Sequence, residues 1–216
     1  MDHTLTPEQK PSRQEAAMRS YYRWQSVMYD LTRWAFLFGR NEILTRLPVS
    51  ADTKGVLLEV GCGTGRNLLR LAKKHPDMRL LGLDVSPDML QRAARATGSY
   101  SRRVLLLEKA YGAAPVSLPQ TPDVILFSYA LTMFNPGWEQ AIAQAQADLP
   151  TGGYIAVVDF HDTPSRIFRW WMGKNHVRMD GHLLPLLETT FLPEYRSTRS
   201  AFFGLWRYML FIGRKA

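Results

Sequence analysis

Cysteine is almost absent from this sequence, and so are long apolar runs. Cys62 is the only cysteine among 216 residues, so no disulfide can form within the chain, as is typical of a reducing compartment. No run approaches the roughly 18 apolar residues that a membrane-spanning helix needs, because the richest stretch, 201–212, is short and contains Arg207. The N-terminus has no basic start followed by an apolar stretch, so no signal peptide is expected. These absences predict a cytoplasmic protein without a transmembrane helix.

Internal repeats and low-complexity tracts are missing as well. The 15 glycines and 13 prolines are spread along a chain that is 46% hydrophobic, which excludes collagenous and disordered classes. The length suits one domain that buries a full core. No metal site is expected.

Acidic residues are scarce in two segments of the chain. The net charge is +8. Residues 10–46 contain 7 basic and 3 acidic side chains, and residues 166–216 contain 9 basic and 3 acidic, so the remainder sums to −2. This distribution indicates an anionic partner, either a lipid surface or nucleic acid, or else a solvated basic surface. Because no nucleic-acid recognition motif is present, a nucleic-acid partner is not expected.

The N-terminal region divides into a tail and an amphipathic segment. Residues 1–12 are polar and contain two prolines, which predicts a disordered tail. Residues 13–48 have apolar side chains at helical spacing on one side and arginines on the other, and Pro48 closes the segment. Such a helix either lies on a membrane surface or packs its apolar face on the core.

Strands alternate with helices over residues 49–216, the expected catalytic domain. The predicted strands are 56–60, 80–85, 104–107, 123–128 and 154–159, with a C-terminal antiparallel pair at 198–203 and 205–212. Helices are expected from the end of the glycine loop to 75, at 87–96 and at 136–149. The alternation predicts an α/β fold, a Rossmann-like and mostly parallel sheet with an antiparallel C-terminal hairpin and helices on both faces.

A glycine-rich loop carries the clearest chemical signal. Gly-Cys-Gly-Thr-Gly at 61–65 follows the first strand and opens a helix, so its backbone can approach a ligand closely. Glu59 precedes the loop, and Asp84 ends the next strand, where an acidic side chain accepts hydrogen bonds from ribose hydroxyls. The dinucleotide-binding pattern Gly-x-Gly-x-x-Gly would require a glycine at position 66. This chain has Arg66 there, and its third glycine is Gly65. An unphosphorylated ribose in a ligand other than NAD is therefore expected.

This spacing resembles the first motif of the class I methyltransferases, which bind S-adenosylmethionine. Thr-Pro-Asp-Val-Ile-Leu at 121–126 and Thr-Gly-Gly-Tyr at 151–154 resemble further motifs of that family. Lys109 stands where many members have an Asp that contacts the adenine, so Glu108 or main-chain groups would take over that contact. The resemblance implies S-adenosylmethionine as cofactor, held by Tyr29, Glu59, Gly61, Cys62, Gly63, Thr64, Gly65, Asn67, Asp84, Val85, Met89, Glu108, Lys109, Ala110, Ser128 and Tyr129.

A narrower resemblance extends over nearly the whole chain. Its segments are Tyr-Asp-Leu-Thr-Arg at 29–33, Phe-Leu-Phe-Gly-Arg at 36–40, Ser-Tyr-Ala-Leu-Thr-Met at 128–133, Val-Val-Asp-Phe at 157–160 and His-Val at 176–177. They are similar to the BtaB-type N-methyltransferases of betaine-lipid synthesis, which methylate the amine of diacylglyceryl homoserine three times. The resemblance implies a lipid substrate with an amino-acid headgroup, and the basic segments agree with an anionic membrane surface. A place on the inner face of the membrane is therefore expected, and the oligomeric state is left open.

Methyl transfer to an amine requires the amine to lose a proton and to be held in line with the donor. The predicted catalytic residues are Tyr129 and His161, together with His176, which the resemblance alone implies; either histidine is otherwise a surface or capping residue. The predicted substrate-binding residues are Tyr22, Tyr29, Arg40, Met133 and Arg178. The arginines would bind the homoserine carboxylate, or else pair structurally with Asp30 and Asp162. Cys62 is expected to be a small packing residue rather than a nucleophile. Phosphatidylethanolamine, a soluble amine and a non-catalytic cofactor-binding role stand as alternatives.

Overall fold

The computed structural model describes residues 37–50, 52–113, 116–134, 136–175 and 177–216. The chain separates into two compact units, 1–37 and 38–216, and the second unit is described by itself. The predicted tail at 1–12 and most of the predicted amphipathic segment lie outside the described residues. Among the residues that are described, no helix is long and apolar enough to cross a membrane.

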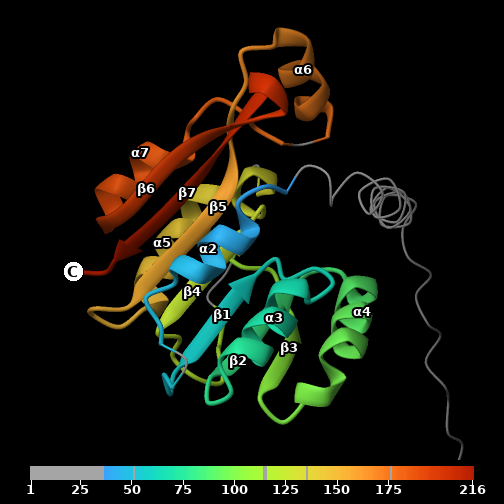
Figure 1. Ribbon diagram of the computed structural model, residues 1–216, viewed down its shortest axis with the longest axis vertical. Helices are drawn as coiled ribbons and strands as arrows, with labels where there is room; N and C mark the ends of the chain where they lie inside the picture. Colours follow the sequence, from blue (N-terminus) through green and yellow to red (C-terminus); the bar gives the residue numbers. More distant parts are fainter. Residues whose placement is uncertain (1–36, 51, 114–115, 135, 176) are drawn as a thin grey trace, which may run out of the picture. The chain divides into compact units, whose positions relative to one another are not determined.

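A seven-stranded sheet with the order β3-β2-β1-β4-β5-β7-β6 forms the centre of this unit (Figure 1). The first five strands are parallel to one another, whereas β7 is antiparallel to both β5 and β6. The predicted fold class is therefore confirmed. The strands are β1 Val56–Val60, β2 Arg79–Asp84, β3 Val104–Glu108, β4 Val124–Ser128, β5 Tyr154–Asp162, β6 Leu192–Ala201 and β7 Trp206–Arg214.

Helices cover both faces of the sheet, with α2 and α3 on the near face in Figure 1 and α5 and α7 behind it. Apolar side chains of β1, β4, β5 and β7 pack against α5 and α7 in one continuous core cluster. The helices are α2 Arg40–Arg46, α3 Arg66–Lys74, α4 Pro87–Thr97, α5 Trp138–Asp148, α6 Arg166–Lys174 and α7 Leu183–Thr190. Three short 3-10 turns are η1 Gly98–Tyr100, η2 Leu131–Met133 and η3 Phe202–Gly204. Because burial of this apolar area is the main favourable term in folding, the core fixes the strand ends that carry the site.

Two predicted boundaries are wrong. The strand predicted at 198–203 begins at Leu192 and ends at Ala201, and Phe202 and Phe203 lie in the turn. The edge strand β6 is exposed along most of its length, so its sequence has no apolar alternation to read. The helix predicted through 47 is interrupted, because residues 37–39 are not helical and α2 begins only at Arg40.

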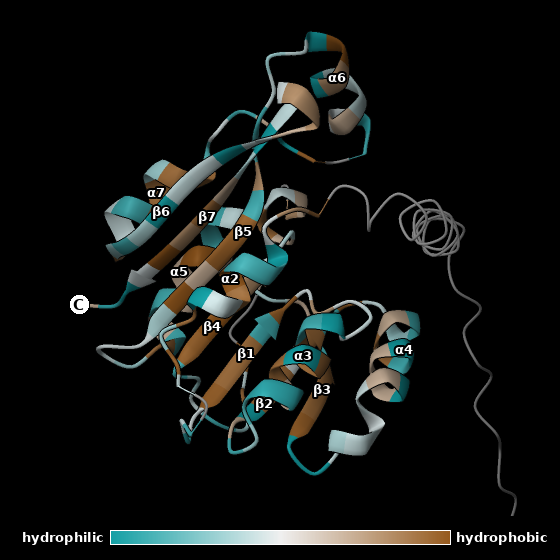
Figure 2. Ribbon diagram, viewed as in Figure 1, coloured by the Kyte–Doolittle hydropathy of each residue, from teal (hydrophilic) through white to brown (hydrophobic). Residues whose placement is uncertain are grey.

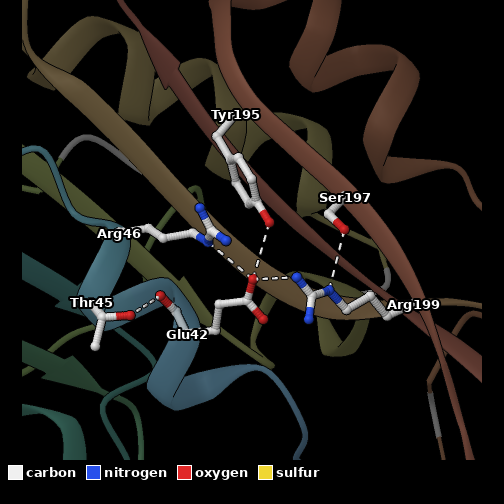
Figure 3. A network of polar contacts seen from close by, with 6 residues as sticks. All are labelled: Glu42, Thr45, Arg46, Tyr195, Ser197 and Arg199. Carbon is white, nitrogen blue, oxygen red and sulfur yellow. Dashed lines mark hydrogen bonds and ion pairs between the residues drawn. The ribbon is translucent and has the colours of Figure 1, made fainter.

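A carboxylate on α2 fastens this helix to the edge strand β6 (Figure 3). One oxygen of Glu42 accepts hydrogen bonds from Arg46 Nε at 3.0 Å, from the Tyr195 hydroxyl at 3.0 Å and from a terminal nitrogen of Arg199 at 2.6 Å. The Arg46 guanidinium also lies 4.1 Å from the centre of the Tyr195 ring. Burial opposes ionisation of Glu42, but these hydrogen bonds and the Arg199 charge hold its pKa below the usual value. The network holds α2 across the near face of the sheet.

Candidate active site

The glycine loop leaves β1 at its carboxyl end in a backbone conformation that favours glycine. Gly61, Gly63 and Gly65 have φ values of 71°, 53° and 72°. A Cβ on Gly61 would lie 2.9 Å from Ala130 Cβ after β4, and one on Gly65 would lie 2.9 Å from Ala93 Cβ in α4. The order of the strands reverses between β1 and β4, and ligands of open α/β sheets bind at such a switch point. The loop is therefore placed where a cofactor is expected.

Asp84 ends β2 and connects the glycine loop to the start of α4. One carboxylate oxygen accepts the Gly63 N–H at 2.8 Å and the other accepts the Ser86 N–H at 3.0 Å. A carboxylate oxygen has two acceptor directions, so Asp84 can still accept hydroxyl hydrogens from a ribose. Its neighbours Val85, which is exposed, and Met89, which is buried, lie in the following turn and the first turn of α4.

Glu59 and Asn67 form a buried polar pair below the loop. The Asn67 amide donates to a Glu59 oxygen at 2.7 Å, and both side chains are buried. The Asn67 Oδ1 atom is buried without a hydrogen-bond partner among the described residues. Since an unsatisfied buried acceptor is costly, this atom fits a ligand that brings a donor, as the ammonium of the methionine part of S-adenosylmethionine does. Of the other loop residues, Thr64 is half-buried and Cys62 is buried, with its Sγ 3.0 Å from the position of a Cβ on Gly82.

The end of β3 carries the predicted adenine contacts. Glu108 is paired in register with Asp84 on the neighbouring strand, and Glu108, Lys109 and Ala110 are exposed. The Lys109 ammonium donates to the Ser117 carbonyl at 3.1 Å. The lysine that replaces the usual Asp is thus held by the following loop.

Tyr129 and Ser128 at the tip of β4 bind the segment that leads into α2. The Tyr129 hydroxyl donates to the Phe38 carbonyl at 2.7 Å, and Arg40 Nε donates to Ser128 Oγ at 3.1 Å. Tyr129 has a φ of 58° and its ring packs edge-on against Phe160, 4.8 Å between centroids. Burial raises the pKa of Tyr129 well above its usual range, and the nearby Asp159 adds to the shift. The geometry therefore favours a positioning role for Tyr129 over the predicted catalytic one.

Asp159 and Thr132 form a buried pair that the site prediction omits. Asp159 on β5 is completely buried and accepts the Thr132 hydroxyl at 2.5 Å, the Thr132 N–H at 3.2 Å and the N–H of Phe160 at 2.8 Å. Burial raises the pKa of Asp159 to about 6. An aspartate between the apolar run 155–158 and Phe160 is the signal in the sequence. The pair holds η2, which contains Met133, against the carboxyl end of β5.

His161 and Arg178 lie on either side of this pair. The register of β5 against β7 shifts between Phe160 and Asp162, which puts His161 at a β-bulge, and its Nδ1 is buried without a partner among the described residues. Burial lowers the pKa of His161, so its imidazole is neutral near pH 7. The backbone N–H of Arg178 donates to the Thr132 carbonyl at 3.3 Å, and its side-chain Nε donates to Asp180 at 2.7 Å. The predicted residues Tyr22, Tyr29 and His176 lie outside the described residues.

Residues 57–153 match the family model of the methyltransferase domain. An N-methyltransferase, NodS from Bradyrhizobium japonicum WM9 in complex with S-adenosyl-l-homocysteine, has the same fold, with a TM-score of 0.66 and 22% identity over 82% of this chain and 85% of that chain. Residues 57–153, less than half of this chain, are thus similar to a methyltransferase domain, and the chain has the Rossmann-like fold of methyltransferases.

Other relatives show how far this assignment reaches. The trans-aconitate 2-methyltransferase of Methylobacterium nodulans is 30% identical over 118 residues, which are 54% of this chain and 42% of that enzyme. The match therefore spans less than half of the relative's length. The [4+2]-cyclase SpnF has the same fold at a TM-score of 0.67, with 19% identity over 82% of this chain and 80% of that one. The same fold thus occurs in proteins with different chemistries, so the reaction of this chain must be argued from its site.

Proposed function

We propose that this chain is an S-adenosylmethionine-dependent N-methyltransferase that methylates the amine of diacylglyceryl homoserine, up to three times, to give a betaine lipid. One observation carries the proposal. Segments that lie far apart in the sequence, and on which the betaine-lipid resemblance rests, meet at the carboxyl ends of β4 and β5. Residues 38–40 are hydrogen-bonded to 128–129, and Thr132 in 128–133 is hydrogen-bonded to Asp159 in 157–160.

The glycine loop, which we propose binds the cofactor, lies beside this meeting point. Gly61 approaches Ala130 closely, so the end of the glycine loop and the tip of β4 border the same place. When bound, S-adenosylmethionine supplies a methyl group that is already activated for transfer. The chain then has to hold the amine and to accept its proton, since only an amine with a free lone pair can attack.

His161 is the side chain best suited to accept that proton. Its imidazole is neutral near pH 7 because burial lowers its pKa, and it follows Asp159 by two residues, at a register shift near the carboxyl end of β5. Tyr129 keeps its proton and anchors Phe38. Arg40 contacts the segment 128–133 through its side chain and Arg178 through its backbone N–H. We propose that their guanidinium groups bind the homoserine carboxylate, for which Arg178 would exchange its pairing with Asp180.

Two observations favour other acceptors. The curated relatives named trans-aconitate 2-methyltransferases point to a carboxylate acceptor, and the same arginines suit a small polyanion as well. The proposed lipid carries both an amine and a carboxylate, so a competition between acceptors decides the question. Phosphatidylethanolamine or a soluble amine would keep the chemistry and change only the substrate.

Lipid mass spectrometry tests the proposal directly. The protein is incubated with S-adenosylmethionine and liposomes that contain diacylglyceryl homoserine and phosphatidylethanolamine, and in a parallel reaction with trans-aconitate. Asp84→Ala, which removes the acceptor for the Gly63 and Ser86 N–H groups, is the control with an impaired cofactor site. Successive methyl additions to the homoserine lipid are expected.

The other outcomes each overturn a different part of the proposal. Methylation of phosphatidylethanolamine alone changes the acceptor lipid, and methylation of trans-aconitate alone contradicts an amine acceptor. Cofactor binding without methylation of any of these compounds contradicts the proposed acceptor and leaves a cofactor-binding protein or an enzyme for a different substrate.

A further inference from the structure

Helix α6 and the turn η3 are joined into one projection, which we call the aromatic knob (residues 166–174 and 202–205). Phe168 of α6 stacks on Trp206, with 5.4 Å between ring centroids, and Phe202 lies 4.6 Å from the same ring. The Thr163 hydroxyl before α6 also donates to the Leu205 carbonyl at 2.6 Å. In Figure 1 the two elements lie together at the end of the sheet towards which β5 runs.

The outward side of the knob is apolar. Ile167 and Trp170 are 81% and 64% exposed, and Trp171, Phe202 and Leu205 are also exposed. At about 100° per residue, Ile167, Trp170 and Trp171 share one side of α6, turned by about 120° from the side of Phe168 and the buried Met172. Figure 2 colours parts of α6 brown, which marks hydrophobic residues on this helix, and the exposed fractions place Ile167 among those that face solvent. An ordinary surface helix presents polar residues there, and contiguous exposed apolar patches mark interaction sites.

The turn η3 holds a phenylalanine out of the protein in a strained conformation. Phe202 and Phe203 have φ values of 45° and 55°, a region that side chains with a Cβ adopt at a cost. Phe203 is fully exposed, so no burial of its ring compensates for the strain within the described residues. Strain that is retained at an exposed site points to a function of that site.

The charge of the knob indicates which partner covers it. Residues 163–179 contain Arg166, Arg169, Lys174 and Arg178 and no acidic residue. The preceding Asp162 is neutralised by Arg207 through two hydrogen bonds. Arg166 and Lys174 form no ion pair with a described carboxylate, and the Lys174 ammonium lies 5.7 Å from the Trp170 ring centre. Arg178 is paired with Asp180, so Arg166 and Lys174 are the cations of the knob that remain available to a partner. Tryptophan and phenylalanine beside such cations suit the headgroup region of an anionic bilayer.

We propose that the aromatic knob docks the protein on an anionic lipid bilayer, with Ile167, Trp170, Trp171 and Phe203 inserted among the headgroups and Arg166 and Lys174 facing lipid phosphates. The inference rests on the proposed function to the extent that a lipid substrate requires access to the bilayer. Its test measures binding rather than methylation, so the two can fail separately.

Vesicle co-sedimentation with the full chain tests the docking. Phosphatidylcholine vesicles with and without phosphatidylglycerol are compared for the wild type and for Trp170→Ser/Trp171→Ser. Leu105→Ser/Leu192→Ser is the matched control, because both leucines are similarly exposed outside the knob. Loss of the two tryptophans is expected to weaken partitioning by about 30-fold or more, and Arg166→Ala or Lys174→Ala by about five-fold each on the anionic vesicles alone.

Phe203→Asn separates docking from folding. Asparagine adopts the left-handed region more readily than phenylalanine, so this variant is expected to be as stable as the wild type or more stable, and still to bind vesicles more weakly. Equal binding by wild type and knob variants, or no binding of the wild type to anionic vesicles at low salt, would overturn the docking. If substitution of the knob dissociates an oligomer, a second copy of the chain is the true occupant. If residues 1–36 become protease-sensitive in a knob variant but not in the wild type, the N-terminal segment is the true occupant. Docking without methylation of the lipid amine would leave this inference intact and contradict the proposed function.

Discussion

The Tyr129 hydroxyl donates a hydrogen bond to the Phe38 carbonyl, 2.7 Å away and 91 residues earlier in the chain. This contact joins the tip of β4 to the segment that leads into α2, directly beside the glycine loop. Because the phenol is buried and its pKa is raised well above the usual range, it remains a donor at any physiological pH. The contact therefore positions the acceptor side of the site rather than transferring a proton.

Tyr129→Phe tests that role. Removal of the hydroxyl leaves the Phe38 carbonyl without its donor, which is expected to lower the free energy of unfolding by about 1–3 kcal/mol and to reduce methyl transfer by less than about 10-fold. Chemical denaturation and steady-state kinetics give the two quantities. Tyr111→Phe is the matched control, because that buried hydroxyl donates to Asp148 at 2.7 Å on α5. It is expected to lose similar stability with no change in rate, whereas a loss of about 1000-fold or more in Tyr129→Phe alone would indicate direct catalysis.

Gly39 is required at the start of α2. Its φ is 76°, and a Cβ would lie 2.7 Å from Tyr208 Cε2 and 3.2 Å from Val158 Cγ2. Gly39→Ala is therefore expected to destabilise the protein by about 1–3 kcal/mol and to weaken methyl transfer, since α2 would have to shift. Gly98→Ala is the control, because Gly98 has a φ of −52° and nothing within 4 Å, and it is expected to be neutral or slightly stabilising. Similar thermal unfolding of the two variants would contradict this account.

The sequence predicts the parallel strands and the cofactor loop well because their signals are local. The parallel strands are apolar runs, most of which lead into a glycine loop or end at an acidic residue, and each lies within a few residues of its prediction. The edge strand β6 is exposed along most of its length, so its beginning at Leu192 has no comparable signal.

The acceptor side depends on contacts between distant segments, and the sequence does not predict those. Arg40 meets Ser128 across 88 residues, and Thr132 meets Asp159 across 27. Tyr129 is a plausible catalytic residue in the sequence, but only the structure places Phe38 beside its hydroxyl. In the sequence Glu42 is likewise an ordinary residue of a helix surface, and only the structure shows that Tyr195 and Arg199 of β6 donate hydrogen bonds to it.

Asp84 is expected to decide cofactor affinity. Asp84→Ala removes the acceptor of the Gly63 and Ser86 N–H groups as well as that of the ribose. Since hydrogen bonds to charged groups contribute about 1.5–3 kcal/mol, the Kd for S-adenosylhomocysteine should rise by roughly 10- to 100-fold in isothermal titration calorimetry. Asp123→Ala is the matched control, because Asp123 accepts the Val56 N–H at 2.8 Å at the opposite end of β1. An unchanged Kd in Asp84→Ala, or an equal loss in the control, would place the ribose elsewhere.

Asp159 is expected to make stability depend on pH in an unusual direction. Burial raises its pKa from 3.8 to about 6, so between these values the folded protein binds a proton that the unfolded chain has lost. Its contribution to the free energy of unfolding is then fully present below about pH 4 and lost as the pH rises through about 6. His161 and His182, whose pKa values are lowered mainly by burial, act in the opposite sense, because stability falls as they are protonated in acid. Only the difference between wild type and a variant isolates Asp159.

Asp159→Asn keeps the shape of the side chain and removes its titration. The variant loses part of the hydrogen bonding to Thr132 and Phe160 at every pH, which changes its free energy of unfolding by a constant offset. On top of that offset, its free energy of unfolding relative to wild type is expected to rise by up to about 3 kcal/mol between about pH 4 and pH 7. Urea unfolding at several pH values measures this difference. A difference that is flat with pH, or that rises towards acid, would show that Asp159 is ionised in the folded protein down to its ordinary range, and that the Thr132 and backbone hydrogen bonds outweigh the cost of its burial.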